Sequence, residues 1–203
     1  MKELVIGTKN QDKRKELKNL LKGLKIKVVS LKRYPGFPDV KEGRVSFRQN
    51  AVRKAMAVSR YTKRLSLADD SGLEVAALGG APGVCSSRFA GKDAAYADNN
   101  RKLLKLLRAR KKRSAQFRCV AAICDYPNVV GVVEGKIRGR IADRPRGRYG
   151  FGYDPVFIVQ GYNKTFAQLK PRIKNKISHR AWALKKAKKL ILGYLKLDAH
   201  KAH

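Results

Sequence analysis

Four short motifs hold residues whose types and spacing suit chemistry on a negatively charged substrate. The first joins the hydroxyl of Thr8, the amide of Asn10 and the ammonium of Lys13, between an expected strand and an expected helix. Donors that converge near a helix N-terminus can bind phosphate. The loop is not a P-loop, because no GxxxxGK(S/T) pattern occurs. The alternative is a loop whose polar side chains only cap the helix.

The second motif is the acidic run Asp69-Asp70-Ser71-Gly72, with Glu42 upstream of it. We expect the run to follow a buried strand over residues 65–69. Carboxylates that meet at one site supply the hard oxygen ligands that Mg²⁺ prefers, and one of them can accept a proton from water. The alternative is a simple turn, but two adjacent aspartates favour function in a chain with few acidic residues.

The third motif is a glycine-rich loop that carries two aromatic rings and a carboxylate, Phe151-Gly152-Tyr153-Asp154. A flat base could stack on Phe151 while Asp154 accepts hydrogen bonds from its N–H groups. The alternative is a tight turn in which the aromatic side chains are plugs.

The fourth motif gathers hydrogen-bond donors before and at the start of the last expected helix: Lys174, Ser178, His179 and Arg180. Such donors could bind a phosphate or a purine carbonyl. The alternative is a solvated helix start.

Strands and helices intermingle along the chain in the pattern that must position these motifs. Apolar runs and β-branched residues predict strands over residues 3–7, 25–31, 65–69 and 155–159, and a hairpin of 115–124 with 129–141. Helical spacing of apolar residues predicts helices after Gln11 and over residues 47–59, 94–108 and 180–196. The class is therefore α/β with a mixed sheet. Residues 1–197 are expected to form a single two-lobed domain, and residues 198–203 a disordered tail.

The charge of the chain is extreme: 48 Lys and Arg against 15 Asp and Glu give a formal net charge of +33. A small soluble domain carries a net charge of about 2–8. The hydrophobic content of 43% is ordinary, so the chain is expected to fold. Basic residues occur everywhere rather than on one face. This pattern favours a deliberately supercharged, engineered surface on an ordinary core over a naturally basic protein, with nonspecific, salt-sensitive binding of nucleic acid as a by-product.

No apolar run approaches the roughly 18 residues of a membrane span, and no signal-peptide core follows Met1. These features predict a soluble, cytoplasmic protein with no membrane partner. The cysteines Cys85, Cys119 and Cys124 are odd in number and lack CxxC spacing, which predicts buried thiols rather than disulfides or zinc ligands.

Six motifs, taken in order over residues 1 to about 196, together resemble the inosine/xanthosine triphosphate pyrophosphatase family. They are Thr8-x-Asn10-x-x-Lys13, Ser46-Phe47-x-x-Asn50-Ala51-x-x-Lys54-Ala55, Ala68-Asp69-Asp70-Ser71-Gly72-Leu73, Leu78-Gly79-Gly80-Ala81-Pro82-Gly83, Gly150-Phe151-Gly152-Tyr153-Asp154-Pro155-x-Phe157 and Ile177-Ser178-His179-Arg180. The resemblance implies an elongated mixed β-sheet flanked by helices, two lobes with a central substrate cleft, and a homodimer.

The resemblance also implies an activity, the Mg²⁺-dependent hydrolysis of deaminated purine nucleoside triphosphates (ITP, dITP and XTP) to monophosphate and pyrophosphate. Such an enzyme removes these deaminated nucleotides from the nucleotide pool. The alternative is an inactive or weakly active supercharged scaffold that binds nucleic acid or anionic proteins nonspecifically. A natural RNA-binding protein is less favoured, because no RNP-type aromatic platform or KH-type loop occurs.

Carried over residue by residue, the resemblance gives each motif a role. Asp70 would bind the metal and act as general base, and Glu42 would be the second metal ligand. Hydrogen-bond donors at the edge of the base would donate to a 6-keto oxygen and would reject the 6-amino group of ATP. The substrate-binding residues would be Thr8, Asn10 and Lys13 for the triphosphate, Ser71, the base pocket of Phe151, Gly152, Tyr153 and Asp154, the clamp of Lys174, His179 and Arg180, and Arg88 as a further phosphate contact.

Three positions depart from the family's pattern. Where the family usually has Glu-Glu, this chain has Lys41-Glu42, and the register places the family's metal-binding glutamate at Lys41. A lysine there would repel Mg²⁺, so either Glu42 substitutes or metal affinity is reduced. Cys85 stands where an aromatic residue is common. Arg148 and Tyr149 replace small residues and are expected to narrow or alter the base pocket.

Overall fold

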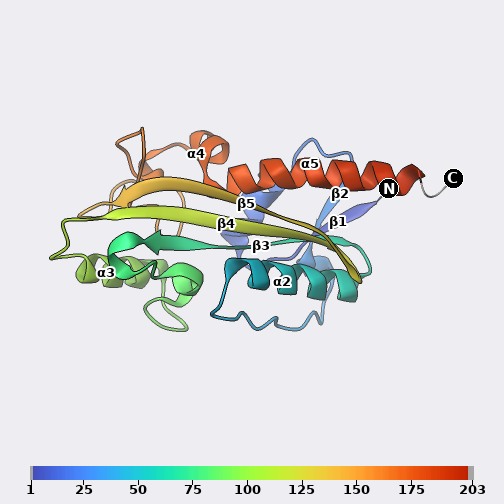
Figure 1. Ribbon diagram of the computed structural model, residues 1–203, viewed down its shortest axis with the longest axis horizontal. Helices are drawn as coiled ribbons and strands as arrows, with labels where there is room; N and C mark the ends of the chain where they lie inside the picture. Colours follow the sequence, from blue (N-terminus) through green and yellow to red (C-terminus); the bar gives the residue numbers. More distant parts are fainter. Residues whose placement is uncertain (1, 201–203) are drawn as a thin grey trace. The chain divides into compact units, whose positions relative to one another are not determined.

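The computed structural model describes the backbone of residues 2–200 and the side chains of residues 2–197 (Figure 1). The strands are β1 Glu3–Ile6, β2 Lys27–Ser30, β3 Leu65–Val75, β4 Ser114–Asp125, β5 Asn128–Ile141 and β6 Phe157–Val159. The α-helices are α1 Gln11–Leu20, α2 Phe47–Thr62, α3 Tyr96–Leu106, α4 Pro171–Ile177 and α5 His179–His200, with short 3₁₀ turns η1 Leu31–Arg33, η2 Ala76–Leu78, η3 Gly83–Arg88 and η4 Phe166–Gln168.

The strands form one mixed sheet in the order β2-β1-β3-β4-β5-β6. β1 pairs in parallel with β2 and β3, so that Val5 lies beside Val29 and Ser66. β5 pairs antiparallel with β6. Only Tyr126 and Pro127 separate β4 from β5, which confirms the predicted hairpin because so short a connection joins antiparallel strands. The α/β class with a mixed sheet is therefore confirmed.

The chain divides into two compact units. The first unit is Met1–Asp70, Cys119–Gly135 and Ala181–His203, and the second is Ser71–Arg118 and Lys136–Arg180. In the first unit, α2 and α5 lie on opposite faces of the sheet (Figure 1). Alternate residues of a strand face opposite sides, and accordingly Leu4 and Ile6 pack in the cluster that contains α5, whereas Val5 packs with Val58 of α2.

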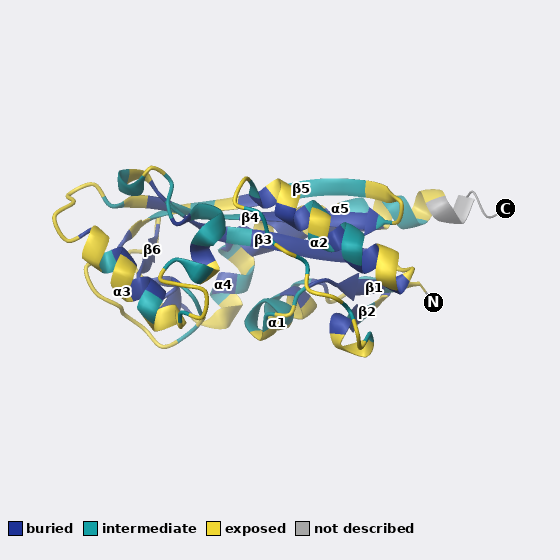
Figure 2. Ribbon diagram, turned by 90° about the horizontal axis from the view of Figure 1, so that it is seen from below, coloured by how far each residue is buried: buried dark blue, intermediate teal, exposed yellow. Residues whose placement is uncertain are grey.

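The core of the second unit forms around the far half of β3, the start of β4 and helix α3. The ring of Phe117 lies 4.6 Å from that of Phe157, which in turn stacks on Phe166 at 5.6 Å. Figure 2 shows how burial varies along the sheet, with β3 mostly buried and β5 largely intermediate or exposed. This aromatic core supports the loop 150–154 and the start of α5.

The acidic run does not end a strand, as the sequence predicted, but lies inside one. β3 continues through Asp69 and Asp70 to Val75. The prediction ended too early because Asp, Ser and Gly are poor strand formers. Burial of Leu73 and Val75 in the second core overrides that local preference.

The last helix extends further than the sequence predicted. Helix α5 continues to His200 and so includes the first three residues of the expected tail, while residues 201–203 lie outside the described part. Among the described residues, no helix combines the length and apolar character that crossing a membrane would require.

Candidate active site

Asp70 is a nearly buried carboxylate, 4% exposed, at the centre of a polar cluster in the first unit. Asn50 Nδ2 donates to Asp70 Oδ2 at 3.0 Å, and Lys54 Nζ lies 3.3 Å from Asp70 Oδ1. Both partners come from α2, where residues four apart share one face of the helix. Ser46 caps the N-terminus of the helix, and its side chain accepts a hydrogen bond from the N–H of Gln49. The Ser46–Lys54 motif therefore serves to place two polar side chains on Asp70.

The same two α2 residues bring Glu42 to the site. Lys54 Nζ lies 2.7 Å from Glu42 Oε1 and so joins Glu42 to Asp70. Asn50 holds the neighbouring backbone, because its Oδ1 accepts from Gly43 N at 2.8 Å and its Nδ2 donates to Gly43 O at 3.1 Å. One amide thus connects the loop that carries Glu42 to the strand that carries Asp70.

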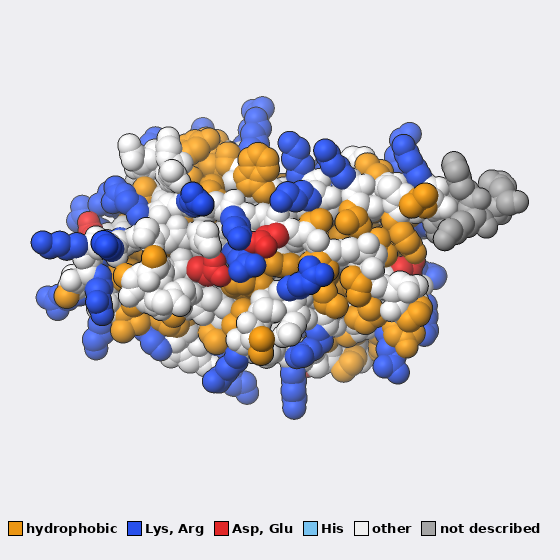
Figure 3. Space-filling model, in the orientation of Figure 1, with side chains coloured by type: hydrophobic (Ala, Val, Ile, Leu, Met, Phe, Trp, Pro, Cys, Tyr) orange, Lys and Arg blue, Asp and Glu red, His pale blue; other side chains and the backbone are white. Residues whose placement is uncertain are grey.

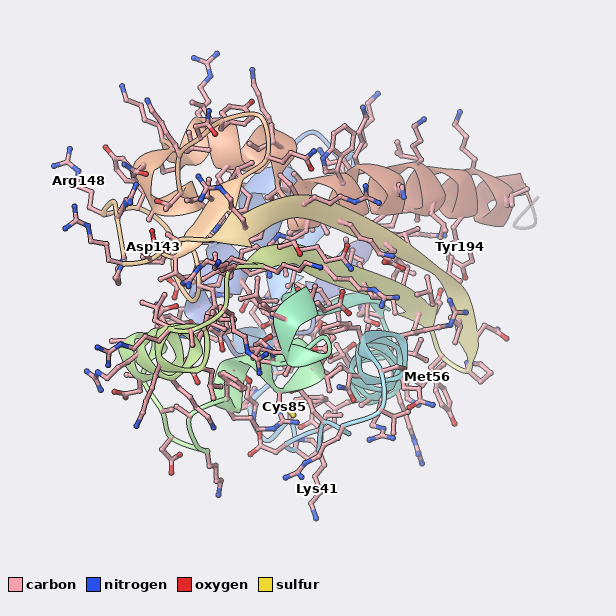
Figure 4. All side chains as sticks on the ribbon, turned by 60° about the vertical axis from the view of Figure 1, so that its left-hand side comes forward. Lys41, Met56, Cys85, Asp143, Arg148 and Tyr194 are labelled. Carbon is pink, nitrogen blue, oxygen red and sulfur yellow. The ribbon has the colours of Figure 1, made fainter. Side chains whose placement is uncertain are left out.

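Lys41 has a different position from its neighbour. Its side chain is exposed and points away from the fold (Figure 4), and its carbonyl oxygen accepts a hydrogen bond from Arg53 Nη1 at 3.1 Å. Glu42 is therefore the carboxylate that the structure brings beside Asp70, and Lys41 is held outside the cluster.

The charges in the cluster shift two pKa values. Burial raises the pKa of Asp70 above its ordinary value, although Lys54 and Lys13 act in the opposite direction. Burial acts to lower the pKa of Lys54, but the carboxylates of Asp70, Glu42 and Asp69 outweigh it and raise that pKa. Lys54 is therefore a permanent cation between two carboxylates, one of which is inclined to take up a proton.

The donor set suits a hard divalent cation with an incomplete protein shell. Within the described part of the chain, no three or more His, Cys, Asp or Glu side chains are grouped closely enough to hold a metal ion. Glu42 and Asp70, however, already converge on one ammonium group. Mg²⁺ is commonly bound by one or two carboxylates, with waters and substrate phosphates as the other ligands. Two convergent carboxylates fit that pattern.

Asp69 faces the other side of β3 and meets the first motif. Its Oδ2 lies 3.5 Å from Lys13 Nζ and accepts a weak hydrogen bond from Cys119 Sγ at 3.7 Å. Thr8 Oγ1 accepts from the N–H of Asn10, and Asn10 caps α1 by accepting from the N–H of Lys13. The first motif is thus a true helix cap, and it also places the Lys13 ammonium beside the aspartates of β3.

In the second unit, Asp154 closes the loop 150–154. Its Oδ2 accepts from the N–H of Phe151 at 2.8 Å and pairs with Lys174 Nζ, and both side chains are buried. Lys174 Nζ also lies 4.6 Å from the centre of the Phe151 ring. Gly152 supplies a carbonyl oxygen that accepts from Asn100 Nδ2 at 3.0 Å. These bonds fix the ring of Phe151 relative to the buried cation of α4.

The other predicted site residues of this unit either pack in its core or donate hydrogen bonds. Tyr153 packs in the second core, and its hydroxyl donates to Ser86 O at 2.9 Å. This packing agrees with the alternative that the aromatic side chains of the loop are structural. His179 stacks on Phe117 with 4.6 Å between ring centres. Arg180 is buried, with Cζ 5.8 Å from the Phe151 ring centre, and its Nη2 donates to Ser71 Oγ at 2.8 Å. Arg180 and Lys174 are therefore two cations beside one aromatic ring.

Four residues outside these clusters were also singled out from the sequence: Arg88, Cys85, Arg148 and Tyr149. Arg88 ends the turn η3. Arg148 points out of the fold (Figure 4) and donates to the hydroxyl of Tyr149 at 3.4 Å. Cys85 is half-buried, and it is a free thiol, as are the buried Cys119 and Cys124, which confirms that the described cysteines form no disulfide.

Sequence reasoning gave no individual role to Asn50 or Lys54, and it singled out Asp69 only as part of the acidic run; the structure places all three in the polar cluster. The available signal was the spacing of Asn50 and Lys54, two polar residues four apart on a helix whose other inward positions are Ala51, Ala55 and Val58. Polar side chains on an apolar face require partners, and here the partner is Asp70.

A pair of glycine substitutions tests the closure of the loop 150–154. Gly150 and Gly152 both have positive φ, +78° and +62°, but only at Gly150 would a Cβ meet another atom, Asp154 Oδ2 at 2.0 Å. Gly152→Ala is expected to cost about 1 kcal/mol of unfolding free energy for backbone strain. Gly150→Ala is expected to cost about 2–3 kcal/mol, because it also displaces the Asp154 carboxylate. Equal losses in denaturant titrations would contradict this account.

Comparison with known proteins finds relatives that match most of the chain. The family model described as the Ham1 family matches residues 4–190. A protein of Desulforamulus reducens named "dITP/XTP pyrophosphatase" is 48% identical over 191 residues, which cover 93% of this chain and 95% of the relative. One of the same name from Bacillus subtilis is 44% identical over 193 residues, 94% of this chain and 98% of the relative.

Solved structures agree with the sequence comparison. The structure of a HAM1 protein from Coxiella burnetii has a TM-score of 0.87 and 41% identity, over 95% of this chain and 100% of that one. The structure of the Staphylococcus aureus Ham1 protein has a TM-score of 0.85 and 37% identity, with the same coverage of both chains. With a family match over nearly its full length and relatives far above 30% identity, the chain belongs to the Ham1 family.

Proposed function

We propose that this protein is a nucleoside triphosphate pyrophosphatase that hydrolyses ITP, dITP and XTP to the monophosphate and pyrophosphate. The observation that carries the proposal is the cluster in which Asn50 and Lys54 hold the carboxylates of Asp70 and Glu42 together. Several relatives bear the name dITP/XTP pyrophosphatase, which agrees with this chemistry.

The residues of the first unit would act on the phosphates. Asp70 accepts a proton from the water that attacks the α-phosphorus, while the bond from that phosphorus to the β-phosphate oxygen breaks and pyrophosphate leaves. Its raised pKa suits it to take that proton. Lys13 and Lys54 offer ammonium groups to the triphosphate, as do the α1 backbone donors near Thr8 and Asn10. Mg²⁺, held by Glu42 and Asp70, would neutralise phosphate charge and polarise the reacting oxygens.

The residues of the second unit would recognise the base. A purine stacks on Phe151, and Lys174, His179 and Arg180 donate to its 6-keto oxygen. Adenine carries an amino donor at that position, which would leave these buried donors without an acceptor and so disfavour ATP. Ser71, Gly152, Tyr153 and Asp154 complete this part of the site by holding Arg180 and the loop in place.

Other features of the sequence add to the proposal. We expect a cytoplasmic homodimer, and we expect nucleic acid or anionic proteins to bind the basic surface nonspecifically, with an affinity that falls as salt rises. On the face drawn in Figure 3, Lys and Arg are spread over the surface rather than gathered in one patch. That distribution supports an engineered, supercharged exterior on a working core. An inactive scaffold is the less favoured alternative, because the polar cluster around Asp70 is fully assembled.

Neighbouring charge changes at positions 41 and 42 test which residue binds the metal. Glu42→Gln is expected to raise the Mg²⁺ concentration for half-maximal activity by about tenfold or more, since it removes one of two ligands. Lys41→Glu is expected to change it by less than about threefold, because that exposed side chain points away and its charge is screened by salt. The reverse pattern in Mg²⁺ titrations of initial rate would place the metal at residue 41.

The products distinguish the proposed reaction from other phosphatase activities. With ITP and Mg²⁺, we expect IMP and pyrophosphate in equal amounts. Release of IDP and orthophosphate would instead mean attack at the γ-phosphorus. Nucleotide chromatography combined with a pyrophosphate assay measures both, and Asp70→Asn is the control for contaminating phosphatases.

A further inference from the structure

Helix α3 contacts the loop 150–154 at two points that are one turn apart. The Tyr96 ring packs against the Phe151 ring, with 5.9 Å between centroids, and Asn100 Nδ2 donates to Gly152 O at 3.0 Å. Because residues four apart share one helix face, Tyr96 and Asn100 reach the loop together. α3 therefore supports the loop at Phe151 and Gly152, in addition to the closure of the loop by Asp154 and Lys174.

Asn100 is an unusual choice for this position. It is 7% exposed, and its Oδ1 is buried without a hydrogen-bond partner among the described residues. An unpaired buried carbonyl carries a free-energy penalty that an aliphatic side chain of the same size would avoid. What the amide contributes in return is the hydrogen bond to Gly152 O.

We propose that Asn100 is a positioning residue for base selection. By fixing the carbonyl of Gly152, it fixes the adjoining Phe151 ring on which the purine stacks. The position of the ring then determines where the 6-keto oxygen of the purine lies relative to the donors of Lys174 and Arg180. The inference rests on the proposed function and adds a residue of α3 to it. Loss of this bond impairs discrimination between 6-keto purines and adenine, and leaves phosphate binding unchanged.

The neighbouring Asn99 provides a matched control. It is also buried, its Oδ1 accepts from Ala90 N at 2.7 Å, and its Nδ2 donates to Ser87 O at 3.2 Å, so it supports a different segment. Asn99→Leu removes both of these side-chain hydrogen bonds, whereas Asn100→Leu removes the one to Gly152 O. A merely structural effect would therefore appear in both variants.

The experiment compares kcat/KM for ITP and ATP, inhibition by pyrophosphate and amide hydrogen exchange of residues 150–154. Asn100→Leu is expected to lower the ITP-to-ATP ratio about tenfold and to speed loop exchange about tenfold, with the pyrophosphate inhibition constant unchanged. Asn99→Leu is expected to leave the ratio and the loop exchange at wild-type values. An isosteric second variant, Asn100→Asp, lacks the donor and gives the same result if the leucine variant folds poorly.

An unchanged ITP-to-ATP ratio in both Asn100 variants would overturn the proposal, as would an equal fall in Asn99→Leu. If the wild-type protein hydrolyses neither nucleotide, the proposed function fails. Hydrogen exchange then decides the positioning role by itself, because it requires no turnover.

Discussion

Asp70→Asn is expected to lower kcat for ITP by about 10³-fold and, at the same time, to stabilise the metal-free protein at neutral pH. Activity falls because the amide neither accepts a proton nor binds Mg²⁺ as a carboxylate does. Stability rises because burial disfavours the ionised carboxylate, as the raised pKa of Asp70 shows. The asparagine keeps an oxygen that can accept from Asn50.

The pH dependence of stability provides the check on this substitution. Between the ordinary pKa of 3.8 and the raised folded pKa, the unfolded chain has released the Asp70 proton and the folded protein still holds it. Unfolding then releases a proton, so the unfolding free energy of the metal-free protein falls as pH rises through that window. In Asp70→Asn this contribution disappears. Denaturant titrations in EDTA from pH 4 upward measure it, and a variant less stable than wild type at pH 7 would contradict the account.

Lys54→Met is expected to weaken the fold and the enzyme while strengthening metal binding. Removing the cation leaves the nearly buried carboxylate of Asp70 and the half-buried one of Glu42 without their shared partner, which costs about 3 kcal/mol in metal-free protein. Loss of an ammonium group beside the triphosphate is expected to lower kcat/KM about 100-fold. Mg²⁺ no longer competes with Lys54 for Glu42 and Asp70, so its apparent affinity rises.

Thermal unfolding across a Mg²⁺ titration measures both effects on stability, since a bound ligand raises the midpoint by an amount that grows with the logarithm of its concentration divided by its dissociation constant. Arg53→Met is the matched control. It removes a cation from the same helix, but one that bonds the Lys41 carbonyl rather than the two carboxylates. Weaker Mg²⁺ binding in Lys54→Met than in Arg53→Met would contradict the role given to Lys54.

The sequence predicted most of the elements because the apolar patterns are strong where one face is buried. β1 is a short apolar run, the segment that forms β2 is rich in β-branched residues, and α2 carries its apolar residues at helical spacing, so these three elements could be predicted from the sequence. β3 could not, since the burial that extends it past Asp70 comes from Leu73 and Val75 packing in the second core. Strand propensity depends on the local sequence and therefore cannot predict such long-range contacts.

For the polar cluster too, the sequence identifies some of the residues but not the contacts that bring them together. The acidic run and Glu42 were recognisable as residue types, but their convergence depends on Asn50 and Lys54, which bridge segments far apart in the chain. The same holds for Lys41 and Glu42, since neighbouring residues in an irregular loop give no periodicity that fixes which side chain faces inward. The sequence predicts that Asp154 accepts hydrogen bonds from the N–H groups of a base. In the structure its carboxylate also accepts from Lys174 Nζ, twenty residues later in the chain.

The most direct test of the central claim is the initial rate of pyrophosphate release from ITP, XTP, GTP and ATP with Mg²⁺, at low and high salt. The account predicts that ITP and XTP are hydrolysed with kcat/KM about 100-fold or more above that of ATP, because the buried donors require a 6-keto acceptor. It also predicts that this preference persists at high salt, where surface charge is screened. Equal rates with ATP, or no release from any nucleotide at any Mg²⁺ concentration, would contradict it.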